Sequence, residues 1–408
     1  MPRRTCSLSP PEWQQPETEP TITLHLRTIT PLFGGGYEPR EVDSHCIIRS
    51  AAIRGHLRFW WRATAGAQYK SAEELFAAEE ALWGSAEKPG KVAIEVALVS
   101  EGSRRLYSEI APKATPQDGP REGVFLFPFQ AQRGDNPLPE AHARENVEFS
   151  LTIRCSSGCL TEVERCVRAW LAFGGVGSRT RRGCGALCET SDPAHWLPPV
   201  DRAQRHSWLR ALTDASSESA AYTVLGKARV VFGQPVVKAG EAWRTLGRFW
   251  CAVRKGHMGD AEGYVPMNGG HWGDYREALA RFERSQDQEI ALAKPFLGLP
   301  IVYQKFDRGP APARYAPTLE ADETGRMASP VILKPIALAN GQFAPLIAVL
   351  SAPDPVRINV KVGHNARVVD LRLPRADRVL RRMGVAHPLD AVVKFAEQEW
   401  RTRAEALP

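Results

Sequence analysis

The sequence lacks any apolar run long enough to cross a membrane, because no stretch of about 18 or more apolar residues occurs in its 408 residues. The first twenty residues carry five prolines and no apolar core. This composition excludes a secretory signal and predicts a frayed tail over residues 1–20. We therefore expect a cytoplasmic protein without membrane contact. Its eight cysteines would be reduced there, so they do not predict a disulfide framework.

Familiar nucleotide-binding and catalytic motifs are also missing. Gly175-x-Gly177 is followed by Thr180 where a dinucleotide fingerprint needs glycine, and it comes after a helical segment instead of a strand. No Gly-Lys-Ser/Thr follows at the Walker spacing, and no H-E-x-x-H, paired-aspartate or Ser-His-Asp signature is apparent. These absences argue against a nucleotide-cofactor enzyme.

The cysteines give a weak metal signal. Cys155 with Cys159 and Cys184 with Cys188 form two C-x-x-x-C pairs, and four thiolates could close a tetrahedral zinc shell. The commoner zinc knuckle has C-x-x-C spacing, so buried free thiols that pack as small hydrophobic groups are the favoured alternative. We expect neither a metal nor a cofactor.

Basic residues are in modest excess and are clustered. Lys and Arg number 53 against 46 acidic residues, for a net charge of +7. The clusters lie at residues 49–62 and 179–182. A clustered basic surface suits a polyanionic partner.

The most informative stretch is residues 174–185, which places five glycines and three arginines in twelve residues. Glycine lets the backbone adopt positive φ and approach a ligand closely, and arginine supplies permanently charged donors for phosphate oxygens. The pattern favours a nucleic-acid contact. The alternative is a structural turn whose arginines face water, and the mutual repulsion of three arginines argues against it.

A second basic element precedes it in the chain. Arg54, Arg58 and Arg62 recur at spacing four on a helix predicted over residues 51–66, so they share one face. The glycines of Leu32-Phe33-Gly34-Gly35-Gly36 lie just before this helix and allow close backbone approach. A solvated basic face over an apolar one is the alternative interpretation.

Hydrophobic periodicity predicts an α+β chain. In the first half, this periodicity predicts four strands and a helix. The helix begins at a Thr161-x-x-Glu164 capping box and ends at Gly174. The expected strands are residues 21–30, 91–99, 146–155 and 186–188. This order of elements suggests a ferredoxin-like βαββαβ domain over residues 21–190. Between two of the strands, the long connection at 111–139 carries Phe125, Phe127 and Phe129 as a short packed strand or a base-stacking platform.

Residues 191–220, with a short helix near Trp208, are the expected linker to a second domain at 221–408. There the pattern predicts a mobile loop at 307–330 and a hairpin at Asn340-Gly341. The expected strands are 222–232, 331–338, 343–350 and 356–362, and the expected helices are 241–255, 272–284 and 390–406.

Three local strings together resemble a known family. They are Thr30-Pro31-Leu32-Phe33-Gly34-Gly35-Gly36, Ile53-Arg54-Gly55-His56-Leu57-Arg58-Phe59-Trp60-Trp61-Arg62-Ala63 and Leu82-Trp83-Gly84-Ser85-Ala86. They are similar to the amino-terminal domain of the RAMP proteins of CRISPR effector complexes, and the second string is closest to the first-subunit family of the type III-B (Cmr) complex. The 174–185 loop resembles the glycine-rich loop of that superfamily.

The resemblance implies two ferredoxin-like (RRM-like) domains of the RAMP type with insertions, in a non-catalytic subunit used in antiviral defence. It implies assembly with other Cmr subunits and contact with guide RNA toward its 3′ end, near the 5′ end of the target RNA. The RNA-binding residues expected from the motifs and the resemblance are Phe33, Gly34, Gly35, Gly36, Arg49, Arg54, Arg58, Arg62, Gly174, Gly175, Gly177, Ser178, Arg179, Thr180, Arg181, Arg182 and Gly183.

Two other functions stay open. A RAMP endoribonuclease that processes guide RNA would need a general base, for which His25, His45 and His56 are the candidates in the first domain. A structural capping subunit would bind its neighbours and contact RNA little.

Overall fold

The computed structural model describes residues 19–38, 40–112, 123–131, 137–213, 221–256, 272–284, 288–303 and 316–408. Most of the predicted tail, much of the 111–139 connection and part of the 307–330 loop lie outside these residues.

The first half forms a four-stranded antiparallel sheet with two helices. Its elements follow one another as β1 (Thr21–Thr28), α1 (Ser50–Ala63), β3 (Val92–Ser100), β6 (Glu148–Cys155), α5 (Leu160–Phe173) and β7 (Leu187–Glu189). The strands are arranged in the order β3-β6-β1-β7. Alternation along β1 buries Ile22, Leu24 and Leu26 against the helices and leaves Thr23 and His25 on the outer face.

The second half repeats this arrangement. Its elements are β8 (Val224–Phe232), α8 (Ala239–Lys255), β12 (Val331–Ala337), β13 (Phe343–Ser351), α11 (Pro388–Trp400) and β16 (Glu405–Ala406). The strand order is β12-β13-β8-β16. Strand, helix, strand, strand, helix and strand therefore follow each other in both halves, with the same succession of neighbours in the sheet.

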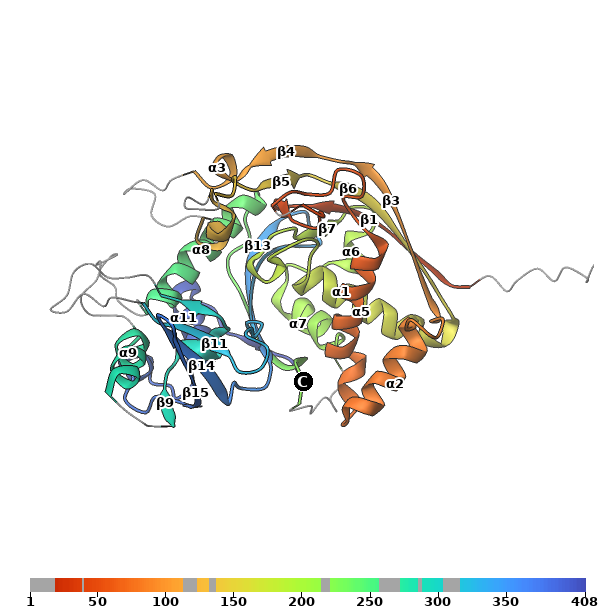
Figure 1. Cartoon of the computed structure of the whole chain (residues 1–408). Coiled ribbons are helices and arrows are strands. Elements are labelled where there is room, and N and C mark those ends of the chain that lie inside the picture. Colours follow the sequence, from red (N-terminus) through yellow and green to blue (C-terminus); the bar gives the residue numbers. More distant parts are fainter. Residues whose placement is uncertain are drawn as a thin grey trace, which may run out of the picture.

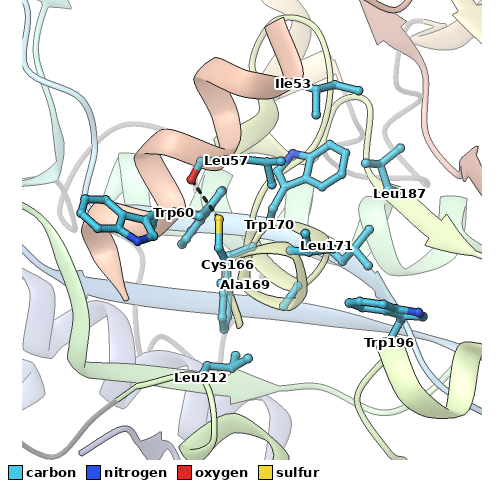
Figure 2. Packing of buried hydrophobic residues seen from close by; sticks show 14 of the residues in the cluster. Ile53, Leu57, Trp60, Cys166, Ala169, Trp170, Leu171, Leu187, Trp196 and Leu212 are labelled. Atoms are coloured by element: carbon cyan, nitrogen blue, oxygen red, sulfur yellow. Dashed lines mark hydrogen bonds between the residues drawn. The ribbon is translucent and has the colours of Figure 1, made fainter. Parts of the chain in front are cut away.

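Both sheets contribute to one large core. Helices α1 and α5 lie between the two sheets, so that Leu57 and Val167 are buried in the same cluster as Leu24 and Leu346. In Figure 2, Cys166 of α5 packs beside Trp60 and Trp170 and donates its thiol to the carbonyl oxygen of Leu57, at 2.9 Å. On its other face the second sheet is covered by α8 and α11. The two halves therefore share buried surface and do not form separate cores.

The second half also carries an inserted sheet, seen at the lower left of Figure 1. Its strands are β9 (Glu289–Ala291), β10 (Ile301–Val302), β11 (Thr318–Ala321), β14 (Arg357–Val362) and β15 (Asn365–Arg372), in the order β10-β11-β14-β15-β9. Helix α9 (Asp274–Arg284) and the short α10 (Arg378–Met383) flank it. A fourth, small sheet belongs to the first half and joins β2 (Leu32–Phe33), β5 (His142–Glu145) and β4 (Ser103–Leu106).

The described residues confirm the α+β class and most predicted elements, including the Asn340-Gly341 hairpin and a helix at Trp208, which is α7 (Arg202–Arg210). Four predictions are wrong. Helix α5 begins at Leu160 with Cys159 as its N-cap residue, so Thr161 lies inside the helix and the capping box does not form. Strand β11 lies within the predicted 307–330 loop, and the last helix ends at Trp400, before β16. The predicted 125–129 strand is instead helical, as α4 (Gly123–Leu126) and η2 (Phe127–Phe129).

Candidate nucleic-acid interface

The two glycine-rich segments lie side by side, although about 140 residues separate them in the sequence. The backbone N–H of Ser178 donates to the carbonyl oxygen of Phe33 at 2.7 Å, and that of Gly185 donates to the carbonyl oxygen of Pro31 at 3.0 Å. The backbone N–H of Val176 closes the second loop on Gly185, at 2.9 Å. The 34–36 turn and the 174–185 loop therefore form one surface element, which we call the paired loops.

Most glycines of the paired loops are explained by contacts within the chain. A Cβ atom on Gly34 would lie 2.3 Å from Oγ of Ser178, and one on Gly177 would lie 2.6 Å from the carbonyl oxygen of Phe33. Gly36, Gly174, Gly175 and Gly183 likewise have chain atoms within 3.0 Å of that position. Contacts this short exclude any side chain, so these glycines are required for packing whether or not RNA is bound.

Gly35 is different. It is exposed, its φ is +97°, and a Cβ atom at this position would have Nη2 of Arg49 as its nearest neighbour, at 3.9 Å. Arg49 is also exposed and immediately precedes α1. The backbone at Gly35 is therefore accessible from outside the chain, and a guanidinium lies beside it.

Tyr37 completes this outer side of the turn. Its side chain is 98% exposed, more than any other large hydrophobic residue that the structure describes. The motifs in the sequence did not single it out, although an aromatic residue directly after three glycines was a readable signal. An exposed ring beside accessible backbone and a cation can stack on a nucleobase.

Arg179 is held in an unusual state. Its backbone has left-handed dihedrals, φ 58° and ψ 32°, which non-glycine residues adopt rarely. Its Nε is buried and has no hydrogen-bond partner among the described residues. Burial lowers the pKa of its guanidinium, with only the thiol of Cys184 opposing that shift. The residue is half-buried, so this unsatisfied donor belongs to a guanidinium that is only partly open to an anionic oxygen.

Arg181 and Arg182 instead point into the second half of the chain. The guanidinium of Arg181 lies over the ring of Phe59, 5.4 Å from its centroid, and donates to the carbonyl oxygen of Ser329. The guanidinium of Arg182 lies 4.4 Å from a ring centroid of Trp250 and donates to the carbonyl oxygen of Val331 at 2.7 Å. The expectation that all three arginines of this loop face phosphate is therefore not supported for these two, which hold the loop against the second sheet and α8.

Within the described part of the chain, no carboxylate forms an ion pair with the arginines of the paired loops. Burial lowers the pKa of Arg182 to about 9, and the neighbouring charges that lower it further, Arg179, Arg254 and Arg181, are all positive. Burial also lowers the pKa of Arg181. Since arginine remains protonated at neutral pH at such values, the loop carries uncompensated positive charge that would attract a polyanion.

The helix arginines have partners of their own. Nε of Arg58 and Nη1 of Arg62 lie 2.5 and 2.6 Å from Oε1 of Glu79, on α2 (Ala72–Trp83), and Nη1 of Arg54 donates to the carbonyl oxygen of Trp83 at 3.1 Å. Glu79 is buried and its two arginines are about one third exposed. The basic face of α1 is therefore the contact surface for α2, which the spacing alone did not indicate.

Two further expectations change with the structure. Phe33 is fully buried and its ring stacks on that of Phe129, with 4.4 Å between centroids, so the expected base contact by Phe33 is wrong. Phe125 is likewise buried, which removes it from any base-stacking platform. Thr180 opens the short η4 helix (Thr180–Arg182) and is half-buried.

The structure does not assemble the cysteines or the histidines into a site. Cys184 lies in the core beneath α8, whereas Cys155 and Cys159 lie in the core of the first half. Among the described residues no group of three His, Cys, Asp or Glu side chains is placed to hold a metal ion. His25 is on the outer face of β1, His45 in an exposed loop, and His56 on α1, where burial lowers its pKa.

Comparison with known proteins indicates which family the chain resembles. The family model of the RAMP superfamily matches residues 25–188. The match covers less than half of the chain, and it confirms the resemblance noted from the sequence.

A more specific relative is the CRISPR system Cmr subunit Cmr1-2 of Pyrococcus furiosus. The two are 29% identical over 174 residues, which cover 40% of this chain and 91% of that subunit. The chain is thus similar to a Cmr subunit over this part.

Solved structures of similar arrangement include Cmr1 of Pyrococcus furiosus in its apo form, with a TM-score of 0.49, 17% identity and coverage of 81% of this chain and 88% of that one. A chain of the type III-B Cmr-beta complex bound to cognate target RNA has a TM-score of 0.47 and 12% identity, covering 93% of this chain and 100% of that one. In the described part of the chain, no helix is both long enough and apolar enough to span a bilayer.

Proposed function

We propose that this chain is a non-catalytic RNA-binding subunit of a type III-B CRISPR effector complex, which acts in antiviral defence together with the other Cmr subunits. It contacts guide RNA toward its 3′ end and the target RNA near its 5′ end. The observation that carries the proposal is the assembly of the paired loops, with Gly35 and Arg49 exposed and the half-buried Arg179 carrying an unsatisfied donor. The RAMP match and the Cmr relative support the same class of protein.

We also propose that both halves are ferredoxin-like domains, with boundaries near residues 21–190 and 221–408. In each half the helices α1 and α5, or α8 and α11, connect strands in the order that this fold requires. Insertions account for the remaining strands, chiefly the five-stranded sheet between α8 and α11.

The binding mechanism separates positioning from sequence reading. Backbone amides near Gly35 and the guanidinium groups of Arg49 and Arg179 hold phosphate oxygens, which carry no sequence information. Tyr37 stacks on a base, which tolerates any of the four bases. Sequence is then read by pairing between guide and target, and this subunit fixes the register of the strand.

The direct test removes the two outer guanidinium groups. The variant Arg49→Ala/Arg179→Asn keeps a residue that tolerates the left-handed backbone at position 179. Its control, Arg202→Ala/Arg210→Ala, makes the same charge change at two exposed arginines of α7. Binding of labelled guide-length RNA is measured across salt, with the subunit alone and with its partner subunits.

Loss of two phosphate contacts should lower the salt slope of log Kd by between about one and two units, while the control keeps the wild-type slope. An unchanged slope in the loop variant would favour the structural capping subunit. Cleavage of RNA by the lone subunit, abolished by changing one of His25, His45 and His56, would favour the endoribonuclease.

Tyr37 has its own test. Tyr37→Ala should weaken RNA binding by roughly 1–3 kcal/mol, the usual contribution of one stacked base. Tyr37→Phe should retain most of the affinity, because the ring is kept. Phe76→Ala serves as the control, since Phe76 is 57% exposed on α2 and lies outside the paired loops. Equal losses in Tyr37→Ala and Phe76→Ala would rule out a specific stacking role.

A further inference from the structure

A second group of arginines, not used by the paired loops, follows strand β15. Residues 364–382 contain six arginines against two aspartates, a surplus of four positive charges in a chain whose net charge is +7. Arg372, Arg375, Arg378, Arg381 and Arg382 are all exposed. More than half of the excess positive charge of the chain is therefore concentrated at one end of the inserted sheet.

These arginines adjoin an open groove of about 1330 Å³ between α9, β9, the segment after β15 and α10. Arg372, Arg375 and Arg381 line it. The volume exceeds the roughly 300–1,000 Å³ typical of small-molecule pockets, which suits a segment of a polymer. Ile290 and Leu380 provide an apolar floor, so the groove combines a surface for bases with cations at its rim.

The acidic groups of the groove are engaged within the protein. Asp274 accepts the backbone N–H groups of Ala293 and Lys294 at 3.0 and 2.6 Å, and Asp377 accepts those of Val379 and Leu380 at 2.8 and 3.1 Å. Glu289 lies 2.8 Å from the guanidinium of Arg372. These three carboxylates are thus neutralised or hydrogen-bonded. The fourth carboxylate of the lining, Glu277 on α9, is half-buried and also interacts within the chain.

By contrast, Arg375, Arg378 and Arg381 make no hydrogen bond or ion pair through their side chains with any residue that the structure describes. Arg378 does not line the groove itself, but it is three residues from Arg381 on α10 and so shares a face with it. Three exposed and unpaired guanidinium groups beside a groove form a natural set of phosphate ligands.

Arg254 interacts electrostatically with a residue of the paired loops and with one of the groove wall. Arg254, near the end of α8, lies near enough to Arg182 for its charge to lower the pKa of that residue, and near enough to Asp274 for this carboxylate to act on its own pKa. Asp274 belongs to the groove wall. Arg254 therefore adds positive charge near both regions.

We propose that this groove binds a single-stranded stretch of RNA, with Arg375, Arg378 and Arg381 on consecutive phosphates and the apolar floor beneath the bases. This inference rests on the proposed function and extends it to a second contact on the inserted sheet. An acidic segment of a partner protein is the competing occupant. RNA is the better match, because a row of unpaired guanidinium groups above an apolar floor fits the regular alternation of phosphates and bases along a strand.

The test compares Arg375→Ala/Arg378→Ala/Arg381→Ala with Arg202→Ala/Arg210→Ala/Arg326→Ala, which removes the same charge from exposed arginines outside the groove. Both triple variants should melt at the wild-type temperature, because every changed side chain is on the surface. Affinity for labelled single-stranded RNA is measured by anisotropy across salt. The groove variant should lose about two units of salt slope and the control none.

Photo-crosslinking of thiouridine-containing RNA to the wild-type chain gives a second measurement, with crosslinks expected within residues 372–386 as well as in the paired loops. A full salt slope in the groove variant, or crosslinks in the paired loops alone, would overturn the groove proposal and leave the proposed function standing. If the groove variant binds RNA normally but fails to join partner subunits, the occupant is an acidic protein segment. If neither the groove variant nor Arg49→Ala/Arg179→Asn changes RNA binding, the proposed function itself fails.

Discussion

The guanidinium of Arg182 lies over the indole of Trp250, 4.4 Å from a ring centroid. It thereby connects the 174–185 loop of the first half to helix α8 of the second half. The indole N–H of Trp243 donates to the carbonyl oxygen of Arg182 at 2.8 Å, so the same residue is held through both its side chain and its backbone. An arginine that the sequence suggested as a phosphate ligand therefore acts as a contact between the two halves.

Arg182→Ala should lower the free energy of unfolding by about 2–4 kcal/mol. The change removes a cation–π contact worth about 0.5–2 kcal/mol and a charged hydrogen bond to Val331 worth about 1.5–3 kcal/mol. Arg182→Lys should lose less, because the ammonium can keep one of the two contacts. Urea denaturation followed by tryptophan fluorescence measures both. Equal stability of Arg182→Ala and wild type would show that the contact contributes nothing.

Gly35→Ala should weaken RNA binding more than its effect on stability explains. The matched control is Gly341→Ala in the hairpin turn, because Gly341 also has positive φ, +82°, and open space where a Cβ would lie. Both changes should cost roughly 1–2 kcal/mol of backbone strain. Only Gly35→Ala should reduce RNA affinity in an anisotropy titration. If Gly341→Ala reduces affinity equally, the loss reflects general destabilisation and the backbone at Gly35 makes no RNA contact.

The sequence predicted the framework well, because long periodic segments report which face of an element is buried. The alternation of Ile22, Leu24 and Leu26 was sufficient to predict β1, and the helical spacing of apolar residues was sufficient to predict α5. The short aromatic run at 125–129 was misassigned, since a run of this length fits a strand and a buried helical turn equally well.

The binding residues were less predictable because their roles depend on partners distant in the sequence. Nothing near Arg58 or Arg62 indicates that Glu79 will lie 2.5 and 2.6 Å from them. In the same way, the sequence does not distinguish Arg181 and Arg182 from Arg179. Only their tertiary contacts with the second half do so. The sequence supplied the set of candidates, and tertiary packing separated the arginines used in structural contacts from those proposed to bind phosphate.

The pairing of Arg58 and Arg62 with Glu79 predicts the effects of Arg58→Ala and Arg62→Ala. Each should lower the free energy of unfolding by roughly 1–3 kcal/mol, because the buried carboxylate of Glu79 loses a charged partner. Neither should change the salt slope of RNA binding, which is measured on the same preparations. Arg49→Ala is the contrasting variant, expected to keep wild-type stability and to lose slope. A reduced slope with unchanged stability in Arg58→Ala would restore the basic face of α1 as an RNA contact.

Lys334→Met should remove a pH dependence of stability. Lys334 is fully buried on β12, its ammonium donates to the carbonyl oxygen of Leu171 at the end of α5, and burial lowers its pKa to about 7 from 10.5. Between these values the unfolded chain binds more protons than the folded chain, so the free energy of unfolding rises with pH across this window. The slope from this one group approaches 1.4 kcal/mol per pH unit, which is about the value of one pKa unit.

The free energy of unfolding is measured by urea denaturation at about pH 7.5, 8.5 and 9.5, which lie inside the window. It should rise more steeply with pH for wild type than for Lys334→Met. Lys70→Met, which changes an exposed lysine, is the control and should keep the wild-type slope. Parallel pH profiles for wild type and Lys334→Met would mean that Lys334 keeps its proton in the folded chain throughout this range.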